Sequence, residues 1–222
     1  MPVLQISRQP DALAWFDTVK GRSVLTAEQQ VIGAAFAARP ARQPWLWLAP
    51  AFTSHPGMEP APVAPPGSVL LRPFRDHYAG SLQCALPLPL ADESVGNLIV
   101  QHVLDDEREG LLEECERILE PGGRLWLFAL NPWSPYRARW RRSGLVARDA
   151  HYWHLRLRRL GLQPCDSDVA YLGPVWRPAV AAAGRGPSRL RVACVMEVEK
   201  RTAALIPPAP VSRHWQTGAA TA

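Results

Sequence analysis

Cysteine is scarce in this sequence of 222 residues, and the four that occur are too far apart to form a common metal or redox motif. Neighbouring cysteines are separated by 29 to 50 residues, which excludes a zinc knuckle and a redox dithiol. The six histidines form no ligand signature either, although His151 and His154 are close enough to share a helix face. We therefore expect no bound metal and buried free thiols at Cys84, Cys115, Cys165 and Cys194.

Long hydrophobic runs are also missing. No apolar stretch approaches the roughly 20 residues that cross a membrane, and Met1 to Pro10 lacks the charged and apolar regions of a secretion signal. Hydrophobic residues make up 47% of the chain and charged residues 20%, which is typical of a globular domain that is stable without metals or disulfides. We expect a cytoplasmic protein.

Lysine is nearly absent, since Lys20 and Lys200 are the only two, and 23 arginines supply the positive charge behind the net value of +5. Eight of these arginines lie between Arg137 and Arg159, interleaved with tyrosine and tryptophan. Arginine among aromatic residues suits phosphates and stacked bases, so this segment is a candidate for binding nucleic acid or an acidic partner. The simpler interpretation is a solvated helix face joined to a basic loop.

The first forty residues predict two helices. The first follows Asp11 and has Trp15 on its apolar face. The second is indicated by the capping-box spacing of Thr26 and Gln29, which precedes a buried stripe and ends at Pro40. These two helices form a candidate cap in front of the main domain.

Apolar runs then predict strands, separated first by a proline-rich loop from Pro50 to Gly67 and later by two helices. Asn97–Gln101, a helix that starts near Asp105 or Asp106, and Arg124–Leu130 form a strand–helix–strand unit, which makes these two strands parallel. The alternation in Leu190–Glu199 predicts an antiparallel strand at a sheet edge. The remaining predicted elements are strands at Trp45–Ala49, Ser68–Arg72, Ser81–Ala85 and Gln163–Tyr171 and a helix at Ala147–Leu160.

Three segments in the middle of the chain carry a specific resemblance. Leu88–Val95 (LPLADESV) is similar to the "LPF-x-D-x-S-F" segment of class I S-adenosylmethionine-dependent methyltransferases of the type 11 kind. Asn97–Leu104, which ends in Gln-His-Val-Leu, resembles strand four of that family and the "HVL" that follows it. Leu112–Leu127 resembles the family's "E-x-x-R-x-L-x-P-G-G-x-L", and all three segments occur in the family's order and spacing.

The resemblance implies an α/β fold: a Rossmann-like, mostly parallel sheet with a C-terminal antiparallel strand pair and two N-terminal helices. The corresponding domain division is an N-terminal helical cap at 1–40, a methyltransferase-like domain at 41–200 and a disordered tail at 201–222. The resemblance also implies S-adenosylmethionine as cofactor. In open α/β sheets such a ligand binds beyond the carboxyl ends of the strands.

The sequence departs from the family where the cofactor should be held. The first loop needs glycines for close backbone approach, but here Ala49 and Pro50 follow the strand. The acid expected after strand two, which would pair with the ribose diol, is replaced by Arg72, and the acid on the adenine side aligns with Cys84. The cofactor contacts expected from position are Leu48, Ala49, Pro50, Arg72, Cys84, Ala85, Leu86 and Gln101.

Two candidate catalytic residues follow predicted strands. His102 comes just after strand four, where a general base could act, although a helix-entry histidine is also a common structural residue. Asn131 begins Asn-Pro-Trp after strand five, where it could orient an acceptor, although a strand-ending turn explains the same residues. Three functional hypotheses stay open: a methyltransferase with unusual cofactor contacts and an unknown acceptor, a catalytically inactive relative that serves as a partner- or nucleic-acid-binding scaffold, and an RNA-binding module without enzymatic ancestry that acts through the arginine cluster.

Overall fold

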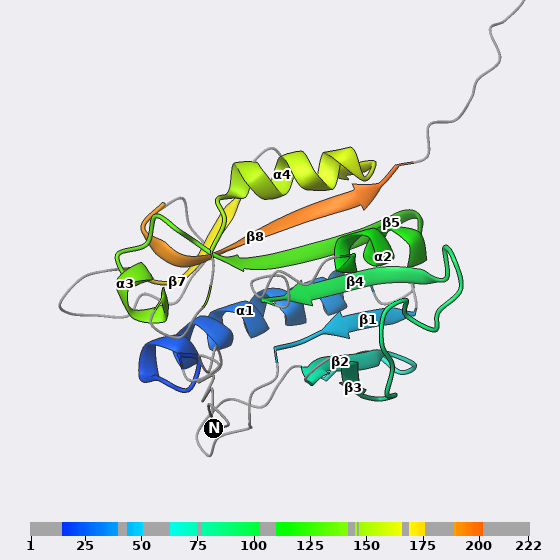
Figure 1. Ribbon diagram of the computed structural model, residues 1–222, viewed down its shortest axis with the longest axis horizontal. Coiled ribbons are helices and arrows are strands. Elements are labelled where there is room, and N and C mark those ends of the chain that lie inside the picture. Colours follow the sequence, from blue (N-terminus) through cyan, green and yellow to red (C-terminus); the bar gives the residue numbers. More distant parts are fainter. Residues whose placement is uncertain are drawn as a thin grey trace, which may run out of the picture.

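The computed structural model describes residues 15–39, 44–50, 63–74, 77–102, 110–141, 145, 147–165, 169–175 and 189–201. Four parallel strands form the centre of one sheet: β1 (Trp45–Leu48), β2 (Val69–Phe74), β4 (Val95–Gln101) and β5 (Leu119–Leu130). They lie in the order β2-β1-β4-β5 (Figure 1). The predicted α/β, Rossmann-like fold with a mostly parallel central sheet is therefore confirmed.

Antiparallel strands complete the sheet at both ends. β3 (His77–Gly80) pairs with β2 at one edge, while β8 (Arg191–Lys200) lies beside β5 at the other end. On its outer side β8 pairs with both β6 (Leu162–Pro164) and β7 (Ala170–Val175). The predicted C-terminal antiparallel arrangement is present, with β8 inserted between β5 and β6.

Three of these strands differ from the sequence-based expectation. The strand expected at Ser81–Ala85 lies earlier, at His77–Gly80, and Cys84 makes only a single bridge to Tyr78. The strand expected at Gln163–Tyr171 is divided between β6 and β7. β8 is not at an edge, because β5 occupies one side of it and β6 and β7 the other, and Val192–Met196 is buried.

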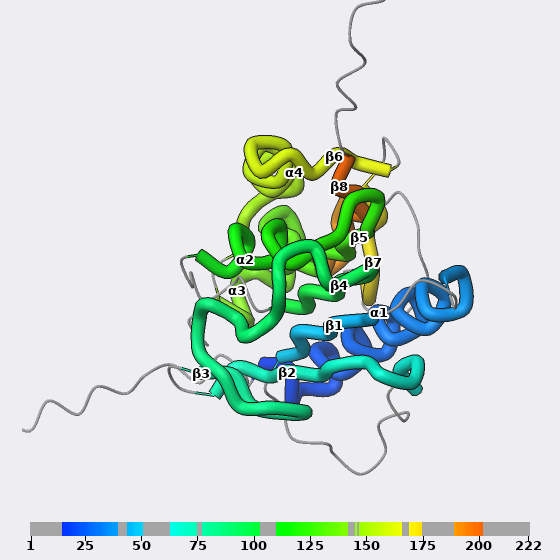
Figure 2. Tube along the Cα trace, turned by 90° about the vertical axis from the view of Figure 1, so that its right-hand side faces the viewer, coloured from blue at the N-terminus to red at the C-terminus, as the bar shows by residue number. Residues whose placement is uncertain are grey.

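The helices cover the two faces of the sheet. α1 (Val19–Ala38) lies on one face, and α2 (Leu111–Ile118) and α4 (Ala150–Arg159) lie on the other, as Figure 2 shows from the side. The short helix α3 (Arg137–Trp140) follows β5 and contributes Trp140 to the α1 face. Each face has its own apolar core, so the sheet is buried on both sides, as continuous apolar strands predict.

Tryptophan fills much of the core on the α1 face. Trp45 and Trp126 stack with ring centroids 5.5 Å apart, and Phe36 of α1 packs edge-on against Trp45 at 4.7 Å. Aromatic pairs of this kind stabilise a core by about 0.5–1.5 kcal/mol beyond their buried area. Trp15 continues the cluster by packing against Trp140 at 5.6 Å. These tryptophans are therefore core residues.

The start of α1 corrects the predicted cap. The helix begins after Thr18, whose hydroxyl accepts from the N–H of Gly21 and donates to the carbonyl of Trp15. Thr26 lies inside the helix, so the capping box predicted there is wrong, and a single helix stands where two were expected among residues 15–39. The earlier part of the first predicted helix lies outside the described residues. α4, by contrast, has its N-cap at Asp149, close to the predicted start.

The Pro-Gly-Gly segment serves packing at the start of β5. Gly123 has no room for a side chain, because a Cβ there would meet the carbonyl oxygen of Glu120 at 2.7 Å. Gly122 has φ +72°, a conformation that glycine adopts without strain. The segment thus joins α2 directly to β5 at the amino end of the sheet, away from the carboxyl ends of the strands.

The segment before β4 is braced by Arg117 of α2. Its guanidinium donates to the carbonyls of Leu88 and Leu90, and it pairs with Glu114 at 2.8 Å and with Asp92. The Arg117 hydrogen bond lowers the pKa of the Glu114 carboxyl, and the N–H of Leu88 adds to this effect against the opposing cost of burial. The contacts of Arg117 thus fix the segment Leu88–Val95 against α2, and both belong to the segments that carry the family resemblance.

All four cysteines are free thiols, as predicted. Cys115 and Cys194 are buried, whereas Cys84 and Cys165 are only half-buried, so the expectation of burial holds for two of the four. The predicted tail at 201–222 lies outside the described residues except for Arg201.

Candidate functional site

The strand order places a crevice at the carboxyl ends of β1 and β4. From β1 the chain proceeds to β2 on one side of it, and then returns to β4 on its other side before continuing to β5. Such a reversal is a topological switch point, and open α/β sheets bind ligands there because the connections leave in opposite directions. In Figure 1 the ends of β1, β4 and β5 all lie toward the left side of the sheet.

A buried hydrogen-bond network occupies this point. The carboxamide of Gln101, at the end of β4, accepts from Nε1 of Trp47 at 3.2 Å and donates to Glu28 of α1 at 2.8 Å. The other carboxylate oxygen of Glu28 lies 2.8 Å from Nε2 of His102. The side chains of Glu28 and His102 are fully buried. Three elements (α1, β1 and β4) therefore meet in one polar cluster inside an apolar core.

Burial of a carboxylate is costly unless hydrogen bonds and an opposite charge compensate for lost hydration. Glu28 has two hydrogen-bond partners, the carboxamide of Gln101 and an imidazole nitrogen of His102. Either an ionised carboxylate with a donating imidazole N–H or the corresponding ion pair fits the 2.8 Å separation. Removal of the Glu28 carboxylate or of the His102 imidazole therefore leaves the other group buried without this hydrogen bond.

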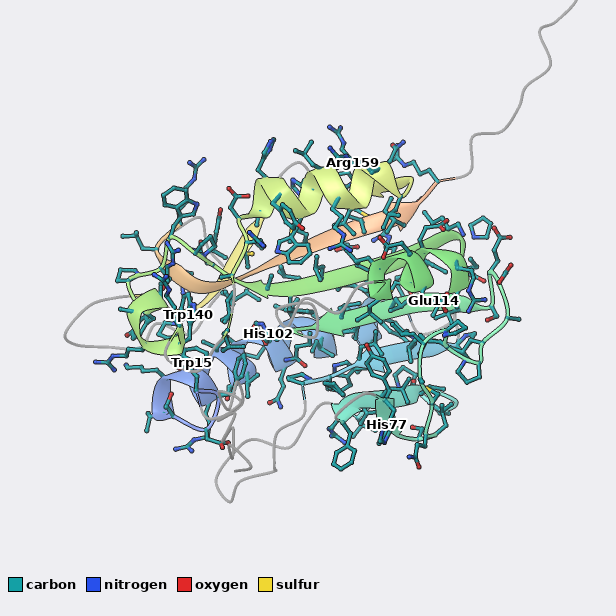
Figure 3. All side chains as sticks on the ribbon, viewed as in Figure 1. Trp15, His77, His102, Glu114, Trp140 and Arg159 are labelled. Atoms are coloured by element: carbon teal, nitrogen blue, oxygen red, sulfur yellow. The ribbon has the colours of Figure 1, made fainter. Side chains whose placement is uncertain are left out.

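The backbone of His102 is held in an unusual conformation. Its φ of +53° lies in the left-handed region, which costs a residue with a side chain on the order of 1–2 kcal/mol. Its N–H donates to the carbonyl of Phe128 on β5, and its ring packs at 4.8 Å against Phe16. Figure 3 shows His102 between Trp15 and the end of β4. The surroundings therefore fix both the backbone and the ring of His102.

The end of β1 offers few groups to a ligand. Leu48, Ala49 and Pro50 are buried, the N–H of Ala49 donates to the carbonyl of Leu71, and Pro50 has no N–H. Residues 51–62, which contain most of the proline-rich loop predicted after this strand, lie outside the described residues. The described part of the first loop thus supplies carbonyl oxygens and apolar surface rather than backbone donors.

The second half of β2, beside the end of β1, carries a cation where an acid is expected. Arg72 is exposed and directly follows Leu71, whose register partner on β1 is Leu48. It therefore lies beside the same edge of the sheet as Ala49 and Gln101. A guanidinium has five donors and no acceptor, so it cannot accept hydrogen bonds from a ribose diol, and it repels a cationic ligand.

Cys84, Ala85 and Leu86 lie farther from the switch point. The reversal of β3 carries the chain back along β2, and Cys84 then pairs with Tyr78 on the outer side of β3. Two strands separate this segment from β1, which corresponds to roughly 14 Å at the usual spacing between strands. Burial raises the pKa of the Cys84 thiol. The structure thus brings Leu48, Ala49, Pro50, Arg72, Gln101 and His102 to one edge and leaves Cys84–Leu86 apart.

Asn131 follows β5 at the same edge and joins it to β8. Its amide nitrogen donates to the carbonyls of Arg189 and Arg191, each at 2.7 Å, and its amide oxygen accepts from the N–H of Trp133. The side chain is buried, and both amide hydrogens are used by these bonds. The next aromatic residue, Trp133, is 67% exposed. This geometry supports the turn-forming interpretation of Asn131.

Glu28, Trp47 and Phe16 are the residues of this site that the sequence analysis did not identify. Glu28 has a signal in the sequence, because it lies four residues after Val24 and four before Ile32, both fully buried positions of α1. A charged residue in the middle of an apolar helix stripe predicts a buried partner. Nothing local in the sequence identifies that partner as His102, since the two are 74 residues apart.

The described residues contain no group of three or more His, Cys, Asp or Glu side chains that could hold a metal ion. Among them there is also no helix that is long and apolar enough to cross a membrane.

No family model matches this sequence, and no curated protein sequence matches it. Solved structures do resemble it. A methyltransferase dependent on S-adenosylmethionine from Thermotoga maritima matches with a TM-score of 0.49 and 14% identity, covering 87% of this chain and all of the other. The 1,6-didemethyltoxoflavin-N1-methyltransferase of Burkholderia thailandensis, solved with S-adenosylhomocysteine, matches with a TM-score of 0.47 and 13% identity, covering 85% and 81%.

A methyltransferase of Archaeoglobus fulgidus dependent on the same cofactor matches with a TM-score of 0.48 and 10% identity, covering 78% of this chain and 94% of the other. All three identities are below 25% and all three TM-scores are below 0.5. The fold class of this chain therefore rests on its own strand order and pairing, described above.

Proposed function

We propose that this chain binds S-adenosylmethionine at the carboxyl ends of β1 and β4 and transfers its methyl group to an acceptor. The observation that carries the proposal is the strand order: a switch point at β1, together with β8 inserted antiparallel between β5 and β6. The segment with the family resemblance, residues 88–134, supplies β4, α2 and β5 of this sheet. The strand order and the segment with the family resemblance thus support the same edge of the sheet as the cofactor site.

The described residues fit this cofactor in part. It carries a sulfonium and an ammonium group, and the buried carboxylate of Glu28 is the negative group at the switch point, which suits a cationic ligand. Arg72 suits it poorly, because a guanidinium cannot accept hydrogen bonds from the ribose diol and repels the cationic groups. We propose that the backbone at Leu48–Pro50 and the region of Gln101 hold the cofactor, which when bound supplies an electrophilic methyl group. The expected affinity is weaker than that of a site with an acid after β2.

His102 is the proposed base. The carboxylate at its Nε2 orients the imidazole, and we propose that the ring takes up the proton that an acceptor releases. The ring is fully buried, so this role requires a change in its packing when an acceptor binds. Transfer of a methyl group depends mainly on alignment, so a base is required only for a weakly nucleophilic acceptor.

The test is thermal unfolding of the full chain with S-adenosylmethionine and, separately, S-adenosylhomocysteine. Binding of either ligand raises the melting temperature, since a ligand at about 100 times its dissociation constant adds about 2.7 kcal/mol to stability. Adenosine and methionine added together serve as the control. Unchanged melting temperatures at millimolar concentrations of both ligands would contradict the proposed cofactor.

The second candidate is a catalytically inactive scaffold. It is favoured by two observations: the polar side chains at the switch point hydrogen-bond to one another, and an arginine stands where an acid is expected. In this case the chain keeps its fold, gives no thermal shift with either ligand, and acts through an acidic partner or nucleic acid on the segment Arg137–Arg159. The four free thiols agree with a reducing, cytoplasmic location for either candidate.

A further inference from the structure

The outer face of α4 carries cations that no carboxylate neutralises within the described part of the chain. Arg158 and Arg159 are exposed in its last turn, and neither forms an ion pair with a described acidic residue. Arg156, one turn earlier, makes a long contact of 3.4 Å with Glu113 of α2. In Figure 3 Arg159 lies on the outermost side of α4, away from the sheet. This face therefore projects uncompensated positive charge into solvent.

Apolar side chains are exposed on the same face. Tyr152 is 40% exposed and Leu155 44% exposed, one helical turn apart on α4. Together with Glu113, Arg156, Arg159 and Leu160 they line a groove of about 490 Å³ between α2 and α4. Favourable interaction with the helix dipole explains cations in the last turn of α4. It does not explain an aromatic ring and a leucine that are left in solvent between them.

A cation also covers the tyrosine. The guanidinium of Arg148 lies 5.4 Å from the centre of the Tyr152 ring, a cation–π geometry. Arg137, Arg139 and Arg141, in and next to α3, are exposed as well, but α3 packs on the α1 face of the sheet and these arginines are not part of the groove. Seen along the chain, exposed arginines precede and follow the exposed ring of Tyr152. The spacing of charge and aromatic surface is the pattern that sequence-tolerant single-strand binders use.

We propose that the groove between α2 and α4 binds a segment of single-stranded nucleic acid. A base stacks on Tyr152 and packs against Leu155, and phosphates bind Arg148 and Arg159, which lie beside this ring and in the groove. An acidic protein segment would satisfy the arginines, but it has no need of the exposed ring, so the ring favours nucleic acid. The proposal names the partner of the second candidate function, and it does not depend on methyl transfer.

The experiment is fluorescence anisotropy with labelled RNA and DNA single strands of about 12 nucleotides, titrated with the full chain between about 50 and 200 mM salt. We expect binding that weakens steeply with salt. Arg159→Glu, at a residue that lines the groove, weakens binding about tenfold and reduces the slope against log salt by about one. Tyr152→Ala weakens binding at least about fivefold, through lost stacking.

Lys20→Glu is the matched control, because it makes the same change in net charge on α1, across the sheet from the groove. It leaves binding within about twofold, and circular dichroism shows which variants are folded. Arg159→Gln removes the charge without placing an acid at the helix end, and it also weakens binding. Three results each overturn the proposal: no binding of either strand at ~50 μM protein and low salt, equal weakening by Lys20→Glu, or binding only of an acidic peptide or of anionic vesicles.

Discussion

Nε2 of His102, at the end of β4, lies 2.8 Å from the carboxylate of Glu28 in the middle of α1, and neither side chain is exposed. The contact joins a helix that precedes the sheet to the point where its strand order reverses. It explains why an apolar helix face carries an acidic residue, and it ties the position of α1 to that of His102.

The first prediction concerns this pair. Glu28→Ala lowers the free energy of unfolding by about 3–5 kcal/mol, because it leaves Gln101 and His102 buried without their common acceptor. Urea denaturation measures the change. Glu113→Ala is the control, since Glu113 forms a long, exposed contact with Arg156, and it stays within about 0.5 kcal/mol of the original. A similar small effect of Glu28→Ala would mean that the network contributes little to stability.

The second prediction separates the two interpretations of Asn131. Asn131→Ala lowers the free energy of unfolding by about 2–4 kcal/mol, because the buried Asn131 carboxamide makes two hydrogen bonds to the carbonyls of Arg189 and Arg191 and accepts one from the N–H of Trp133, and all three are lost. Trp133→Ala, at an exposed neighbour, changes stability by less than about 0.5 kcal/mol. Thermal unfolding of both variants gives the comparison. If Asn131→Ala melts like the original chain and only methyl transfer is lost, the residue serves the acceptor rather than the turn.

The third prediction concerns the cation in the second half of β2. Arg72→Asp strengthens binding of S-adenosylhomocysteine about tenfold, because it supplies an acceptor for the ribose where the family resemblance implies one. Arg72→Ala removes the cation without adding an acceptor and gives an intermediate affinity. Isothermal titration calorimetry compares the three chains. Equal affinities of the aspartate and alanine variants would show that the ribose does not lie near this position.

The fourth prediction follows from the brace around Arg117. Its hydrogen bond lowers the pKa of Glu114, so the folded state binds that proton less readily than the unfolded state does. The resulting stabilisation is present above about pH 4.5, the ordinary range of a glutamate, and is lost as the pH falls through the lowered folded pKa. Glu114→Gln removes this part of the pH dependence. The measurement is the urea midpoint of both chains between about pH 3 and 6, and identical pH dependences would contradict the role of Glu114.

The fifth prediction concerns thiol reactivity. Burial raises the pKa of Cys115 far above that of an ordinary thiol, with Glu114 and Glu113 adding to the effect, so almost no thiolate forms at pH 8. Iodoacetamide therefore modifies Cys115 only in unfolded protein, whereas the half-buried Cys165 reacts in the native state. Peptide mass spectrometry after short exposure distinguishes the sites. Native modification of Cys115 at the rate of Cys165 would contradict its burial.

Local patterns in the sequence predicted the order and type of the elements in the unit β4–α2–β5 but not their bounds, because α2 begins after Gly110 and not near Asp105 or Asp106, and β5 begins at Leu119 and not at Arg124. Each of its elements is a continuous apolar run or an amphipathic helix, and short connections restrict how such neighbours pair. The cap of α1 was predicted wrongly because Thr26 and Gln29 have the right spacing, while the true cap, Thr18, is identified by hydrogen bonds to Gly21 and Trp15. Residue spacing alone does not distinguish a cap from a helix interior.

The other features of the fold and the site could not be predicted, because they depend on contacts between segments far apart in the sequence. The alternation in β8 reports side chains that point to opposite faces, but it contains no information on which strands lie at either side. The reversal of β3 likewise depends on its pairing with β2, and it moved Cys84 away from the switch point. In the site, His102 and Gln101 were found because they follow a strand, whereas Glu28 comes from a helix 73 and 74 residues earlier.

This separation has a consequence for synthesis of the protein. The ribosome releases α1 long before β4, so Glu28 spends that interval as a hydrated carboxylate on a nascent helix. It can leave water only when the far later strand brings its two partners, because until then nothing compensates for its desolvation. Closure of so long a loop is slow relative to formation of a helix. The polar cluster at the crevice therefore forms only after β4 has emerged, well after α1 has become helical.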